Sequence, residues 1–351
     1  MNFPHHPHEH PHHHPRIAGS LDRRALLKSG AFGLGAMFLA ACSSSDSKSA
    51  GRYGNSSPTP STSRPDATDR VDLTTGATEK SLDGFDAFSD SVRTFTTGDL
   101  WLVESNGLPA HQMMVGITSW QQQVPVAQAY SGANAWQFPV TPEMADSPIS
   151  AKTGLFRGAI AIAANGIPIF NALNNRGDDA FLSGELDEFG GHCGRGDDYH
   201  YHTAPFHLEE AVGPRNPIAY ALDGYAIYGS VEPDGSAVVD LDEFNGHTGT
   251  DGVYHYHGTT DYPYINGGLV GVVEVSDQVE PQPATPGFRG AGEPLPGATI
   301  TGFDDLGDGS YVLEYTIDDK VGMVAYTVTD TTVAFKFTSP TGEVTSETYS
   351  R

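Results

Sequence analysis

Leu186-Asp187-Glu188-Phe189-Gly190-Gly191-His192 is followed by Gly194 and then by Tyr199-His200-Tyr201-His202. The pattern returns 55 positions later as Leu241-Asp242-Glu243-Phe244-Asn245-Gly246-His247, Gly249 and Tyr254-His255-Tyr256-His257. Eleven of these 17 aligned positions are identical. Self-similarity at a fixed offset is typical of a supersecondary unit that occurs twice. The sequence therefore predicts an internally repeated structure.

The likeness extends upstream of both copies. Residues 159–171 and 218–229 each hold two apolar runs joined by a turn dipeptide, Asn165-Gly166 or Asp223-Gly224. Such dipeptides between apolar runs predict a β-hairpin with a type I′ turn. The predicted fold is mainly β, with internally duplicated hairpin-plus-strand units (159–207 and 218–264) forming one β domain, followed by a small C-terminal β meander.

The histidines of the repeat have the spacing of metal ligands. Residues i and i+2 of a strand share a face, so each Tyr-His-Tyr-His run presents two imidazoles together, and a third histidine precedes them across a Gly-containing turn. Three imidazoles leave a fourth position open and suit Zn or Cu ions better than hard cations. The predicted ligands of the two H-x7-H-x-H sites are His192, His200, His202, His247, His255 and His257. Two mononuclear sites and one binuclear site both remain open.

Other residues of this region have weaker signals. His111 is a further possible ligand, and Cys193 next to His192 offers a thiolate for soft metals. Asp187, Glu188, Asp242 and Glu243 are placed to accept hydrogen bonds from the ligand histidines, although capping of their own loop explains them equally well. For His111 and Cys193 a structural role is the alternative.

The charge and the cysteine content exclude several classes of protein. The 351-residue chain has 44 acidic and 19 basic residues, a net charge of −25. Nucleic acid and anionic lipid are therefore poor partners, whereas metal ions are suitable ones. Two cysteines, Cys42 and Cys193, exclude a disulfide framework.

The N-terminus has the pattern of an export signal. Arg23-Arg24 precedes an uncharged stretch, residues 29–41, that is too short to span a bilayer. It resembles a twin-arginine signal, and Leu39-Ala40-Ala41-Cys42 resembles a lipobox in which Cys42 is lipidated. We expect an exported cell-envelope protein, periplasmic or at the cell surface, that meets the membrane through this lipid anchor only. An ordinary cleaved signal is the alternative.

Composition divides the rest of the chain. Residues 1–42 are the signal segment, and residues 43–84 are predicted to be a disordered Ser/Thr/Pro tether. The main domain covers 85–275, a Pro/Gly-rich linker covers 276–297, and 298–351 form the appendage. Alternating residues from 311 onward predict a four-strand meander there.

Residues from about Trp101 to Val275 resemble the YHYH domain of bacterial exported proteins. The resemblance rests on the two Tyr-His-Tyr-His runs, on Asn165-Gly166 and Asp223-Gly224 with their flanking apolar residues, and on Tyr262-Pro263-Tyr264. It implies a domain type without an activity, because the family has no settled biochemical function.

Three functions are compatible with these features. The first is a cell-envelope lipoprotein that binds Zn or Cu through the duplicated sites. The second is a metal-dependent hydrolase or copper oxidase that uses an open coordination position, with its substrate undefined. The third is an adhesion or scaffold module whose histidines are structural. The sequence has no Gly-x-Ser-x-Gly, His-Glu-x-x-His, P-loop or dinucleotide motif, so whether the protein is an enzyme depends on the metal alone.

Overall fold

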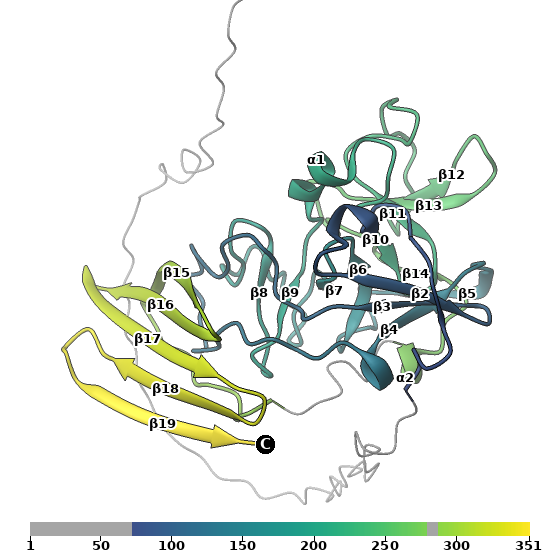
Figure 1. The fold of residues 1–351 in the computed structure, drawn as a ribbon. Helices are drawn as coiled ribbons and strands as arrows, with labels where there is room; N and C mark the ends of the chain where they lie inside the picture. Colours follow the sequence, from purple (N-terminus) through teal and green to yellow (C-terminus); the bar gives the residue numbers. More distant parts are fainter. Residues whose placement is uncertain (1–71, 279–286) are drawn as a thin grey trace, which may run out of the picture. The chain divides into compact units, whose positions relative to one another are not determined.

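A computed structural model describes residues 72–278 and 287–351 of the chain. The predicted signal segment and the predicted tether up to residue 71 lie outside the described residues. The described residues are mainly β and form four sheets (Figure 1). None of their helices has the length and apolar character needed to cross a membrane.

The largest sheet has eight strands in the order β12-β13-β11-β10-β6-β7-β9-β8. β6 and β10 lie side by side at its centre, and the order of the strands outward from them is the same on both sides. We call β6–β9 the first half and β10–β13 the second half. Their bounds are β6 Ala159–Ala163, β7 Pro168–Phe170, β8 Gly191–Cys193, β9 Tyr199–Tyr201, β10 Ala219–Ala221, β11 Ala226–Tyr228, β12 Gly246–Thr248 and β13 Tyr254–His257.

The two halves also pair their strands in the same way. In each half the first two strands form an antiparallel hairpin, and the last two strands form a second one. The two hairpins of a half join through a parallel pair, β7 with β9 or β11 with β13. All five residues of β6 are fully buried, so the centre of this sheet is a continuous apolar core.

The turn type predicted for the first hairpin of each half is wrong, although both hairpins are present. A type I′ turn needs positive φ at both central residues. Positive φ occurs at Gly166 (78°) and Gly224 (93°) but not at the preceding Asn165 and Asp223. The Gly166 N–H donates to Ala163 O at 2.8 Å, which leaves a three-residue loop that ends on glycine. Only glycine adopts the left-handed conformation here.

An aspartate and a tyrosine organise the second hairpin of each half. Tyr199 donates to Asp187 Oδ2 at 2.7 Å, and Tyr254 donates to Asp242 Oδ2 at 2.8 Å. The other oxygen of each aspartate accepts backbone N–H groups of its own turn. Each tyrosine ring lies against a glycine of the neighbouring strand, Gly191 or Gly246, where a Cβ atom would clash with the phenol. These bonds hold the tyrosines on one face of the hairpin.

Smaller sheets and short helices surround the eight-stranded sheet. β4 packs on β10 through the stacked rings of Phe138 and Tyr220, whose centroids are 5.5 Å apart. Residues 72–84, the end of the predicted tether, contribute β1 and the buried Leu82. The elements are β1 Thr78–Glu79, β2 Arg93–Thr97, β3 Leu100–Glu104 and β4 Trp136–Pro139 in one sheet, β5 Met144–Ser150 and β14 Gly268–Gly271 in another, with η2 Phe85–Phe88, η3 Gly132–Asn134, η4 Phe206–Leu208, α1 Glu209–Val212 and α2 Val275–Gln278.

The C-terminal meander has five strands rather than the four predicted. They are β15 Thr299–Gly307, β16 Ser310–Ile317, β17 Lys320–Val328, β18 Thr332–Thr338 and β19 Val344–Ser350. β15 escapes a pattern search because irregular register at Ile300/Gly302 and Asp305/Gly307 breaks its alternation. The meander contacts the rest of the protein at several points; for example, the Ile300 N–H donates to Ile117 O at 3.0 Å, and the Tyr326 hydroxyl donates to Pro125 O.

Gly246→Ala tests the tyrosine contact. Its Cβ would enter the space of the Tyr254 hydroxyl, which is fixed by Asp242, and overpacking of this kind costs about 1–3 kcal/mol. We expect urea denaturation to show a loss of this size in the free energy of unfolding. Gly290→Ala is the matched control, because nothing lies within 4 Å of the Cβ that it adds. Equal effects in the two variants would refute the proposed clash.

Candidate metal centres

The second hairpin of each half explains the spacing of the histidines. His192 on β8 lies directly opposite His200 on β9, and His247 on β12 lies opposite His255 on β13. Directly opposed residues of an antiparallel pair have Cβ atoms about 4.5–5.5 Å apart. The third histidine follows two positions later on the same face. A hairpin of this register therefore gathers three imidazoles.

The first-half cluster, which we call site 1, consists of His192, His200 and His202. The Nε2 atom of His202 is 3.0 Å from that of His192 and 3.1 Å from that of His200. The rings of His200 and His202 are buried, and Phe170 stacks on His200 with ring centroids 3.9 Å apart. His192 is partly exposed. The three predicted ligands thus meet at their Nε2 atoms.

The partners of the Nδ1 atoms show which tautomer the buried rings of His200 and His202 adopt. His200 Nδ1 is 3.0 Å from Asp198 O, and His202 Nδ1 is 2.5 Å from Asn171 O. A carbonyl oxygen only accepts, so Nδ1 carries the proton and a neutral ring is left with a bare Nε2. Burial also lowers the pKa of His192 well below its usual value and that of His202 to about 3. Unprotonated lone pairs therefore face one another, and a cation between them would relieve their repulsion.

The separations of the nitrogens suit one shared ion. With Zn–N distances of about 2.05 Å, a 3.0–3.1 Å separation corresponds to an angle of about 95° at the ion. Three donors at such angles cover one side of an ion and leave the other side accessible.

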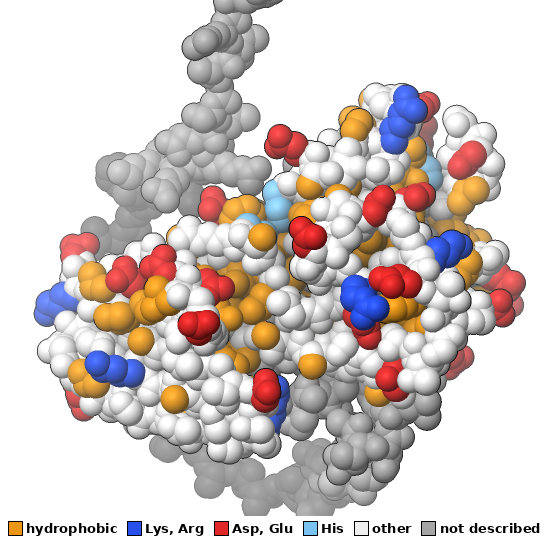
Figure 2. Space-filling model, viewed as in Figure 1, with side chains coloured by type: hydrophobic (Ala, Val, Ile, Leu, Met, Phe, Trp, Pro, Cys, Tyr) orange, Lys and Arg blue, Asp and Glu red, His pale blue; other side chains and the backbone are white. Residues whose placement is uncertain are grey.

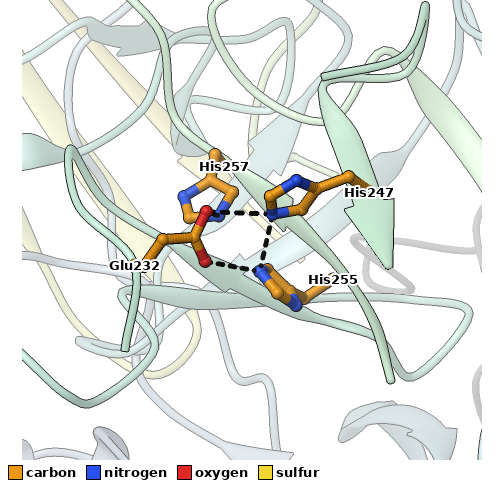
Figure 3. A group of neighbouring side chains, drawn as sticks. All are labelled: Glu232, His247, His255 and His257. Atoms are coloured by element: carbon orange, nitrogen blue, oxygen red, sulfur yellow. Dashed lines mark hydrogen bonds and ion pairs between the residues drawn. The ribbon is translucent and has the colours of Figure 1, made fainter. Parts of the chain in front are cut away.

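The second-half cluster, site 2, has a carboxylate as well as three histidines (Figure 3). Glu232 Oε1 is 3.0 Å from His247 Nε2 and 3.5 Å from His257 Nε2, and Oε2 is 3.1 Å from His255 Nε2. His247 Nε2 and His255 Nε2 are 3.1 Å apart. Site 2 therefore presents three nitrogens and a carboxylate, a complete set for tetrahedral Zn²⁺.

One atom of site 2 lacks a hydrogen-bond partner. The Nδ1 atom of His257 is 3.1 Å from Gly229 O, which assigns its proton to that nitrogen. Its Nε2 atom is fully buried, points into the cluster and makes no hydrogen bond with any described residue. A buried polar atom without a partner is costly. A metal ion bound by the four side chains would satisfy it.

Sites 1 and 2 are separate. They lie near opposite edges of the eight-stranded sheet, with β7, β6, β10 and β11 between β9 and β13. At about 4.8 Å per strand, the two strands are about 24 Å apart along the sheet. The two clusters are therefore too far apart to share a binuclear site, and any metal ion held by one would be separate from an ion held by the other.

His111 and Cys193 do not join either cluster. The Nε2 atom of His111 is 2.7 Å from the Tyr201 hydroxyl, on the tyrosine face of β9, and its ring stacks on Phe189. Cys193 is buried, and burial raises the pKa of its thiol well above the usual value, which favours the protonated form. Neither residue belongs to a possible ligand group among the described residues.

The four acidic residues predicted to support the histidines do not contact them. Asp187 and Asp242 instead hold Tyr199 and Tyr254 and cap their turns, while Glu188 and Glu243 are exposed. The predicted support comes from elsewhere, mainly from the backbone carbonyls of Asn171 and Gly229. These two carbonyls follow β7 and β11, the strands that pair in parallel with the histidine strands.

Glu232 is the residue that sequence reasoning missed. A search for repeated residues finds only what the two halves share, and Asn174 occupies the corresponding position of the first half, 58 residues earlier. The available signal was the difference between the two copies: the second copy alone has a carboxylate three residues after Gly229, the residue that aligns with Asn171.

Fold and site define a mainly β protein with two histidine clusters near the two edges of one sheet. Residues 135–240 match the sequence model of a family described as "YHYH protein", which supports the resemblance found in the sequence. The matched range includes the first Tyr-His-Tyr-His run and ends before the second. No curated protein and no solved structure matches the chain.

The buried ring of His202 predicts an acid-sensitive fold. The pKa of His202 is about 3 in the folded protein and 6.5 in the unfolded chain. Because the unfolded chain takes up the proton first, the stability of the fold decreases as the pH drops from 6.5 toward 3. This linkage amounts to about 2.5 kcal/mol between pH 7 and pH 4.5. His202→Asn keeps a donor for Asn171 O without the titrating ring. In urea denaturation of metal-free protein, we expect the variant to lose about 2.5 kcal/mol less than the parent over this range. Equal losses would contradict the assignment.

Proposed function

We propose that this protein binds two transition-metal ions, Zn²⁺ or Cu²⁺, one at site 1 and one at site 2. The observation that carries the proposal is the meeting of bare Nε2 atoms whose rings are held by backbone carbonyls at Nδ1. Carbonyl or carboxylate partners of this kind orient most metal-binding histidines. A structural role for the histidines does not account for the unpartnered Nε2 of His257.

The two sites would differ in accessibility. Site 2 offers four protein ligands, which is typical of a closed structural or storage site. Site 1 offers three ligands and borders a cavity of about 370 Å³. An open position beside a cavity also supports a second candidate function, a metal-dependent hydrolase in which the ion activates a bound water.

The cellular setting belongs to the same proposal. The twin-arginine pattern and the lipobox ending at Cys42 support export and attachment to a membrane through lipid. Both lie outside the described residues. The acidic surface is compatible with a role in holding or handling cations in the cell envelope.

Metal content tests the two sites. The chain from residue 43 onward keeps every described residue and removes seven histidines of the leader that would bind metal themselves. We expect about two Zn²⁺ ions per chain by elemental analysis after dialysis. His200→Ala/His202→Ala and His255→Ala/His257→Ala should each retain about one ion, because each removes two ligands of a single site.

His111→Ala is the control for this experiment, since it removes a histidine outside both clusters and should leave two ions bound. Full occupancy in both double variants, or less than one ion in the parent chain, would contradict the proposal.

Lipid attachment is tested in the full chain, produced in a bacterium with a twin-arginine pathway. Cys42→Ala removes the only side chain that a lipobox can acylate, so the protein should move from the membrane fraction to the soluble fraction. Cys193→Ala, the control, should stay with the membrane. Unchanged fractionation of Cys42→Ala would refute lipidation.

A further inference from the structure

Site 1 and site 2 differ at one equivalent position. Asn174 and Glu232 occupy matching turns, because Asn174 N–H donates to Asp178 O at 2.8 Å and Glu232 N–H donates to Ser236 O at 3.0 Å. A β-bridge closes each turn: Leu173 pairs with Asp179 in the first half, and Val231 pairs with Ala237 in the second. The two turns therefore have the same backbone hydrogen bonds, and they differ in the side chain at position 174 or 232.

The Asn174 side chain is committed elsewhere and does not close site 1. Its Oδ1 atom accepts from the N–H groups of Arg176 (2.9 Å) and Asp178 (3.1 Å), and its amide donates to Glu185 at 3.1 Å. Among the described residues, the possible ligands at site 1 are the three histidines alone. A metal ion there would keep a coordination position free, toward the cavity.

The cavity at site 1 has an unusual charge for this protein. Acidic side chains dominate over basic ones on the face shown in Figure 2, and the net charge is −25. The cavity nevertheless has two arginines, Arg176 and Arg195, and one acidic residue, Glu185, in its lining. The hollow beside site 2 is lined by four carboxylates and neither lysine nor arginine. The lining beside site 1 thus has more basic than acidic residues, whereas the lining beside site 2 has acidic residues and no basic ones.

Only one of the two arginines is available for a ligand. Arg176 is ion-paired with Glu185 and, at 3.1 Å, with Asp178. Arg195 is exposed and makes no ion pair with any described residue. One available positive charge matches a monoanion better than a phosphate ester with two negative charges.

The rest of the cavity wall is partly apolar. Trp120, Phe156 and Phe170 contribute rings to it, and Phe156 is 39% exposed. A volume of about 370 Å³ is at the lower end of the range for small-molecule sites. The ligand that fits has a small apolar body and one anionic group.

We propose that site 1, when it holds its metal, binds a small monocarboxylate with an apolar or aromatic body. A carboxylate oxygen takes the open coordination position, Arg195 balances its charge, and the aromatic wall contacts the body. The proposal rests on metal binding at site 1. Site 2 has no such role, because Glu232 already supplies the carboxylate.

The test uses Co²⁺ as the bound ion and benzoate as the probe, with the chain from residue 43 onward. Co²⁺ absorbs in the visible range, and its spectrum changes with its ligands. We expect a saturable spectral change with benzoate in the parent chain and in His255→Ala/His257→Ala, which keeps site 1. His200→Ala/His202→Ala, which keeps site 2, should not respond. Benzylamine has the same body without a carboxylate and should have no effect.

Two further variants examine the mechanism. Asn174→Glu copies site 2 into site 1 and should abolish the benzoate response while Co²⁺ stays bound. Arg195→Gln leaves the Asn174 turn intact and should raise the apparent Kd for benzoate about tenfold. It keeps the test decisive if Asn174→Glu does not fold.

The outcomes separate the two proposals. Two bound Co²⁺ ions without a benzoate response, or a response that persists when only site 2 remains, would overturn carboxylate binding and leave metal binding intact. Fewer than one bound ion in the parent chain would overturn metal binding itself.

Discussion

The register of two short hairpins is the constraint on which the rest of this structure depends. Along β9 and β13 the side chains alternate, so the tyrosines and the histidines occupy opposite faces. The bonds from Tyr199 to Asp187 and from Tyr254 to Asp242 fix which face is which. A slip of one residue would turn the imidazoles toward the tyrosine side. A hydrogen bond to a charged group contributes about 1.5–3 kcal/mol, and this favours one register most strongly at the buried Tyr199–Asp187 pair and less at the partly exposed Tyr254–Asp242 pair.

Much of this arrangement could be predicted from the sequence, because it depends on local spacing. The repeat predicts the hairpins, and the position of His192 eight residues before His200 places it opposite that residue once the strands pair. Support for the rings was not predictable in the same way. The carbonyls of Asn171 and Gly229 reach the histidines through parallel strand pairing, which joins residues about 30 positions apart. Glu232 also comes from a distant segment, and no repeated residue points to it.

The two halves share a scaffold and differ in what surrounds the histidines. Glu232 adds a negative charge at site 2, and the acidic lining of the neighbouring hollow would attract free cations from solution. Asn174 leaves site 1 with neutral donors, and Arg195 makes its entrance less attractive to a cation. Site 1 is consequently better suited to a cation that binds together with an anion, whose negative charge Arg195 would balance. If both clusters bind metal as proposed, the difference at this one turn position would separate a closed site from an open one.

The C-terminal segment adds to this difference through its contacts with the turn of the first half. Arg289 donates two hydrogen bonds to Asp197, at 2.8 and 2.9 Å, in the turn that joins β8 and β9. The ring of Phe335 in the meander lies under the same guanidinium, 4.3 Å away. The matching turn of the second half has Gly252 in place of Asp197, and the next residue, Val253, is 54% exposed. Removing one partner of a buried ion pair costs about 3–5 kcal/mol, so Arg289, packed against Phe335 of the meander, stabilises the turn of site 1. A preformed open site would need such support, whereas a site with four protein ligands would gain order from a bound ion.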